Sequence, residues 1–61
     1  MKVKELIAEL KECNQEDEVV LSCDEEGNSF SSLDKQSIAT GYAVKTVVLF
    51  PFEEGIELDF V

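Results

Sequence analysis

Thr46-Val47-Val48-Leu49-Phe50-Pro51 is the strongest strand signal in the sequence, because β-branched and aromatic residues favour extended backbone. Pro51 has no backbone N–H to give to a ladder, so the strand is expected to end there or to lie at a sheet edge. Val19-Val20-Leu21 is a second short apolar run and predicts another buried strand. Both runs are apolar on both faces of the sheet that they predict.

The segment after the second run predicts a turn and a return strand. Asp24-Glu25-Glu26-Gly27-Asn28 has turn chemistry, since glycine and asparagine both tolerate positive φ. Residues 29–33 predict a short return strand with Phe30 and Leu33 directed to the core.

The remaining segments predict a loop, a turn and a last strand. Residues 34–41 are polar and predict a loop, and Glu53-Glu54-Gly55 predicts a turn. Residues 56–60 alternate apolar and acidic side chains, which is typical of a strand with one solvent-facing side.

The N-terminal segment predicts an amphipathic helix at about residues 3–12, because Val3, Leu6, Ile7 and Leu10 recur at helical spacing. No Ser, Thr, Asp or Asn precedes it as a cap, and Asn14 is expected to end it in a left-handed conformation. The sequence therefore predicts an α+β fold: one N-terminal helix packed on a small three- to four-stranded, mostly antiparallel sheet, as a single domain over residues 1–61.

One short helix covers only one face of such a sheet. The other face would expose valine and phenylalanine side chains, which usually marks an interface. Self-association would cover this face, so a homo-oligomer, most simply a dimer, is expected. The alternative is that residues 29–44 fold over it.

The charge is strongly negative. The 61 residues include 14 acidic residues and 5 lysines, with no Arg and no His, for a formal net charge of −9. Nucleic acids and anionic membranes are polyanions, so neither is expected as a direct partner, whereas a basic protein surface is. The alternative is that the acidity only keeps the protein in solution.

Targeting signals and membrane spans are not expected. The N-terminus runs into an amphipathic pattern without the apolar core of a signal peptide, and no apolar run approaches about 20 residues. A cytoplasmic location is therefore expected, with Cys13 and Cys23 reduced.

Catalytic and metal-binding patterns are also not evident in the sequence. Without His or Arg, the chain lacks the commonest general base, the commonest metal ligand and the bidentate phosphate clamp. Cys13 follows the expected helix and Cys23 precedes two acidic residues, and both settings disfavour a thiolate. A calcium loop beginning at Asp24 would need Gly sixth and Glu twelfth, where the sequence has Ser29 and Lys35. We expect no enzymatic activity, no cofactor and no metal.

The acidic residues are the candidate protein-binding residues. They occur in three groups that could bind a basic surface or, on one face, imitate the phosphates of a DNA duplex. The alternative is a solvated acidic edge that protects a strand from aggregation. The candidates are Glu16, Asp17, Glu18, Asp24, Glu25, Glu26, Glu53, Glu54, Glu57 and Asp59.

The order of these motifs resembles a family of small proteins encoded by tailed bacteriophages. In that family a helix, here residues 4–10, precedes Val-Val-Leu-Ser-Ser-Asp-x-Glu-Gly-Asn and Ser-Pro-Leu, which correspond here to residues 19–33. Gly-Tyr and Val-Val-Leu-Trp-Pro follow, and residues 41–42 and 47–51 match them. The departures are Cys23 for Ser, Ser32 for Pro, Phe50 for Trp, a short connection from Tyr42 to Val47 where relatives often carry an acidic insertion, and an extra tail after Pro51. The family carries no assigned activity, so the resemblance implies only a phage accessory protein in a bacterial cell.

The expected function is a non-enzymatic module that binds, and modulates or inhibits, a host or phage protein. One alternative is an oligomer that sequesters a small ligand such as a signalling nucleotide. In that case the 24–32 loop would lie at a subunit interface, and Lys35 and Lys45 would have to contact phosphate. A structural role in the virion is a further alternative.

Overall fold

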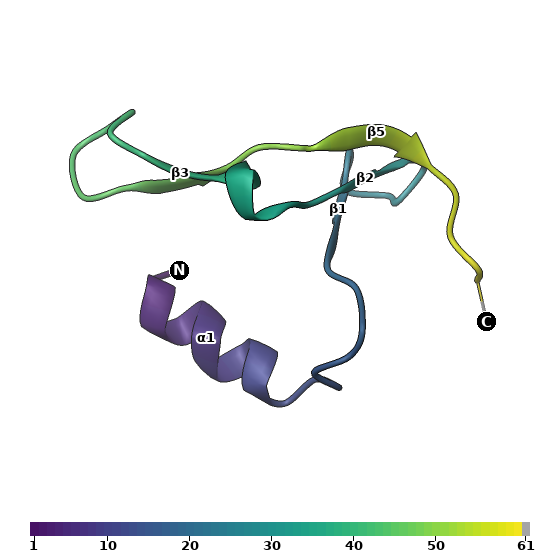
Figure 1. Cartoon of the computed structure of the whole chain (residues 1–61), viewed down its shortest axis with the longest axis horizontal. Coiled ribbons are helices and arrows are strands. Elements are labelled where there is room, and N and C mark those ends of the chain that lie inside the picture. Colours follow the sequence, from purple (N-terminus) through teal and green to yellow (C-terminus); the bar gives the residue numbers. More distant parts are fainter. Residues whose placement is uncertain (61) are drawn as a thin grey trace.

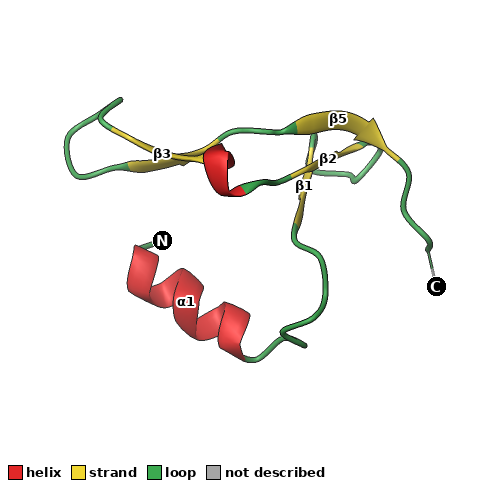
Figure 2. Ribbon diagram, viewed as in Figure 1, coloured by secondary structure: helices red, strands yellow, loops and turns green. Residues whose placement is uncertain are grey.

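The computed structural model describes residues 1–60 (Figures 1 and 2). Within this range the chain forms one α-helix, a short 3₁₀ helix and five strands, in two antiparallel sheets with the orders β1-β2-β5 and β3-β4. The α+β class is confirmed, and the strands divide between two small sheets. The elements are α1 (Val3–Lys11), β1 (Val20–Ser22), β2 (Phe30–Ser32), η1 (Lys35–Ser37), β3 (Ile38–Thr40), β4 (Val47–Leu49) and β5 (Glu53–Ile56).

The helix α1 matches its sequence prediction to within one residue, and its C-terminal end differs from the prediction. The Lys2 N–H donates to Glu5 Oε1 (2.8 Å), so a side chain inside the first turn satisfies a free backbone donor. Asn14 is not left-handed, because Lys45 is the one non-glycine residue with positive φ in the described chain. Instead, Gln15 Nε2 donates to the carbonyl of Leu10 (3.0 Å) near the helix end. Nowhere in residues 1–60 does a helix have the length and hydropathy needed to cross a membrane.

Most of the sheet structure is one long, bent antiparallel ribbon. Residues 30–40 run against residues 47–56, first as the β3–β4 ladder and then as the β2–β5 ladder. Figure 1 shows the two ladders end to end. Between them the Phe50 N–H donates to the Ser37 carbonyl (2.8 Å), and Pro51 lies at the break, outside both ladders. The ribbon therefore tolerates a proline without losing a ladder hydrogen bond.

Three local predictions are corrected. The predicted loop 34–41 contains η1 and β3, the predicted turn 53–55 belongs to β5, and the predicted strand 56–60 ends at Ile56. The cause lies in pairing with distant residues: the Glu53 N–H donates to Ser32 Oγ (3.1 Å), and β5 completes its ladder on β2. Gly55, with φ of 70°, bends β5 where the register with β2 shifts.

The fold leaves its apolar surface largely uncovered. No apolar side chain in residues 1–60 is fully buried, and the two buried residues are Ser31 (1% exposed) and Ser37 (3%). The accessible area of 5722 Å² exceeds the roughly 4,000 Å² of a compact monomer of 6.8 kDa. The radius of gyration is 12.8 Å, against about 10.5 Å for a compact chain of this length. The single chain therefore lacks a closed hydrophobic core.

Candidate functional site

All ten acidic candidates are exposed to solvent, and the structure places them on three segments. Glu16, Asp17 and Glu18 lie in the connection between α1 and β1. The second group occupies the turn between β1 and β2, and the third lies in β5 and directly after it. The second and third groups are Asp24, Glu25 and Glu26, and then Glu53, Glu54, Glu57 and Asp59.

The turn between β1 and β2 is organised around the carboxylate of Asp24. Its Oδ1 accepts the backbone N–H groups of Glu26 (3.0 Å) and Asn28 (3.1 Å), and its Oδ2 accepts Asn28 Nδ2 (3.1 Å). Gly27 has φ of 73°, which closes the turn. The backbone hydrogen bond from Asn28, followed by the other donors of the turn, lowers the pKa of Asp24 below its ordinary value. Asp24 therefore has a structural role besides its charge.

Neutralising Asp24 is expected to change how stability depends on pH. The folded state lowers the pKa of Asp24, so the charged form stabilises the fold above the ordinary pKa of about 3.9. This contribution is lost as the pH falls through the lower pKa of the folded state. Asp24→Asn should thus be less stable than wild type at pH 7, and the difference should shrink toward pH 3, which urea unfolding at several pH values measures. The control, Glu25→Gln, removes a neighbouring charge and leaves the donors of the turn bound to Asp24. Equal curves for both variants would contradict the role of Asp24.

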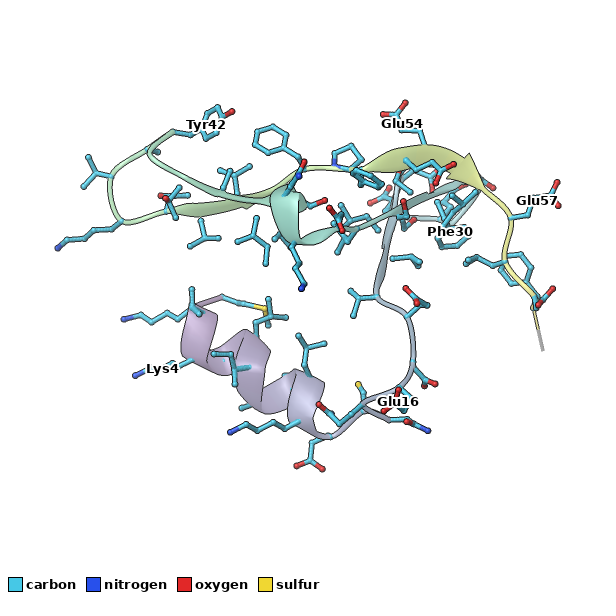
Figure 3. All side chains as sticks on the ribbon, viewed as in Figure 1. Lys4, Glu16, Phe30, Tyr42, Glu54 and Glu57 are labelled. Carbon is cyan, nitrogen blue, oxygen red and sulfur yellow. The ribbon has the colours of Figure 1, made fainter. Side chains whose placement is uncertain are left out.

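The structure brings two of the three acidic groups close together. The register pairs Ser31 with Glu54, and the end of the turn lies beside the residues after Gly55, because both line one shallow cavity of about 450 Å³. Glu16 lies apart: Figure 3 shows it at the opposite edge of the molecule from Glu54. The ten carboxylates therefore do not form one continuous face.

Charge is segregated along the fold. Residues 12–34 and 53–60, which contain β1, β2 and β5, hold 12 of the 14 acidic residues and no lysine. We call this part the acidic half. Residues 35–52, which contain β3 and β4, hold two lysines and no acidic residue. The acidic half therefore carries uncompensated negative charge, and the β3–β4 ribbon carries none.

An apolar cavity of about 550 Å³ lies between α1 and the sheets. Leu6 and Leu10 line it from the helix, Leu21 and Leu33 from the β1–β2 side, and Leu49 from β4. The helical spacing predicts the face that α1 presents, but the cavity itself was not predicted. Its lining offers few polar partners to a small ligand.

The shallow cavity of about 450 Å³ lacks the cationic groups that would bind the phosphates of a nucleotide. It lies beside the 24–32 loop, where the sequence had suggested a small-ligand site, and it is lined by Asn28, Ser29, Phe30 and residues 55–58 and 60. Glu57 is its charged residue, and none of the five lysines lines it. Lys35 lies instead at the apolar cavity. A phosphate group would meet a carboxylate and no cation there.

The two thiols are free and exposed. Cys23 Sγ lies 3.3 Å from Ser31 Oγ, and Cys13 Sγ lies 3.8 Å from the carbonyl oxygen of Glu9 in the preceding helical turn. In residues 1–60 no three His, Cys, Asp or Glu side chains gather as metal ligands would.

Comparisons of the chain with protein-family models, with curated proteins and with solved structures found no match.

Proposed function

We propose that this chain is a non-enzymatic accessory protein of a tailed bacteriophage that acts in the cytoplasm of the host cell. It binds a host or phage protein through the acidic half and modulates or inhibits that protein. The observation that carries the proposal is the segregation of charge. The acidic half contains 12 exposed acidic residues and no lysine. A basic protein surface is the complementary partner.

The physics of exposed charges defines how such binding should behave. One solvent-exposed ion pair contributes only about 0.2–1 kcal/mol, so binding would need many carboxylates acting together. Their summed field would also accelerate encounter with a basic partner. Both effects weaken as salt shortens the screening length from about 10 Å at 0.1 M to about 3 Å at 1 M.

The test is capture of partners from a bacterial lysate by the tagged protein, at low and at high salt, with identification by mass spectrometry. The acidic half predicts a partner that is retained at about 0.1 M salt and lost at about 1 M. Glu53→Gln with Glu54→Gln should weaken capture. The matched control, Glu5→Gln with Glu9→Gln on α1, removes the same charge elsewhere and keeps an oxygen to accept the Lys2 N–H.

The outcomes separate the versions of this function. A partner that is held equally at both salt concentrations and by both variants would contradict binding through the acidic half. A DNA-binding partner would favour mimicry of DNA, although the separation of Glu16 from Glu54 does not resemble one continuous array of phosphates.

A further inference from the structure

The β3–β4 ribbon has an apolar face on the side away from α1. Ile38 and Leu49 pair across the ribbon and line the cavity toward α1, so the next pair, Ala39 and Val48, points to the opposite side. Phe50 continues this side by alternation. We call this side, with Tyr42 against it, the outer face.

Aromatic side chains dominate the outer face. Tyr42 packs on Phe50 with ring centroids 5.1 Å apart and an interplanar angle of 53°. Tyr42 is nevertheless 70% exposed, and Figure 3 shows it on the edge of the ribbon that is turned away from α1. Exposed aromatic residues of this kind are enriched at the centres of protein interfaces.

The charge pattern identifies which partner can approach this face. Two molecules that each carry a formal charge of −9 repel one another, except where acidic residues are absent. Residues 35–52, which contain the β3–β4 ribbon, are such a region, since their charged residues are Lys35 and Lys45. A strongly basic partner would be drawn instead to the acidic half, so a second copy of this chain is the occupant that the charges favour.

The chain as a whole has surface to bury in an association. It exposes roughly 1,700 Å² more than a compact monomer of its mass. This excess is spread over the helix, both sides of the ribbon and the C-terminal segment, and the outer face supplies part of it. A standard interface buries about 800 Å² per partner, roughly half of this excess.

We propose that two copies of this chain form a two-fold dimer, with the outer faces of their β3–β4 ribbons packed on one another. An antiparallel arrangement keeps the two acidic halves apart. It also directs Lys45, at the tip of one ribbon, toward the partner's Glu53 and the partner's Glu54. The dimer does not depend on the binding function of the acidic half, and the two are measured separately, by mass and by salt-sensitive capture.

The test is the molar mass of the purified chain in solution over a concentration series, by sedimentation equilibrium or light scattering. The expected mass is about twice 6.8 kDa, and the melting temperature should rise with protein concentration, because association stabilises the folded state. A mass of 6.8 kDa at every concentration would overturn the proposal.

Two variants and one control locate the interface. Tyr42→Glu places a charge on the outer face and should raise the dissociation constant at least about tenfold. Val48→Thr keeps the branched shape of the side chain and should preserve the ribbon, so it decides the question if Tyr42→Glu fails to fold; about tenfold weaker association is expected from its buried hydroxyl. Phe60→Glu makes an aromatic-to-carboxylate change at an exposed residue outside the ribbon and should leave the dimer intact. A dimer that is unaffected by the Tyr42 and Val48 variants would overturn the outer face as the interface.

Discussion

Replacing Leu6 with aspartate is expected to release α1 from the rest of the molecule and to unfold most of the chains at 25 °C. Leu6 is the one residue of α1 that is not classed as exposed, and it lines the apolar cavity opposite Leu33 and Leu49. Nine residues are too few for a stable isolated helix, so α1 depends on the apolar side chains that it turns toward this cavity. The loss of the leucine side chain and the desolvation of a carboxylate cost roughly 3 kcal/mol together. A chain of this length has only a few kcal/mol of net stability.

Far-UV circular dichroism and urea unfolding measure this effect. The control is Ala8→Asp, which adds the same charge at an exposed position of the helix and should cost about 0.5 kcal/mol through helix propensity alone. If both variants kept the helical signal and unfolded at the same urea concentration, the apolar face of α1 would not hold the helix in place.

Elements determined by neighbouring residues were well predicted. The spacing of apolar residues gave the helix and its inward face, including Leu6 and Leu10. The apolar runs gave β1 and β4 to within about one residue, and the turn residues gave the β1–β2 hairpin. In each case local propensity and side-chain periodicity agree with the final fold.

Elements determined by distant partners were missed. Ile38-Ala39-Thr40 lies among polar residues and has no strong strand signal of its own, so its strand depends on the ladder with β4. Glu53-Glu54-Gly55 has the composition of a turn, and it becomes a strand by pairing with β2. The division into two sheets follows from η1 and Pro51, which interrupt the two sides of the ribbon at the same level.

The candidate surfaces were predictable in part. The acidic residues were identified by type, but their spatial grouping depends on the pairing of β2 with β5, which the sequence did not reveal. The outer face follows from the apolar character of residues 47–50 on both sides of a strand, which already predicted an uncovered face. Tyr42 was not assigned to it, since its contact with Phe50 forms only when the ribbon turns back at residues 41–46.

Replacing Gly27 with valine is expected to destabilise the fold by about 2 kcal/mol, because a β-branched residue is strained at positive φ. Gly27 has φ of 73°. Space for a Cβ is not the obstacle, since an added Cβ would lie 3.5 Å from the Phe30 ring, an ordinary van der Waals contact. Relief of the backbone strain would move Asn28 away from Asp24 and break the hydrogen bonds that close the β1–β2 hairpin.

The matched control is Gly27→Asn, because asparagine enters the left-handed region more readily than other residues with a side chain. Gly27→Asn should lower the free energy of unfolding by less than about 1 kcal/mol. The two variants should differ clearly in the urea concentration at the midpoint of unfolding, with similar dependence of the unfolding free energy on urea. A difference of this sign would show that the conformation at residue 27, and not the loss of a glycine as such, holds the turn. Equal losses for valine and asparagine would mean that the added side-chain atoms, and not the backbone angle, disturb the hairpin. That result would contradict the inference that the hydrogen bonds of Asp24 stabilise the β1–β2 hairpin.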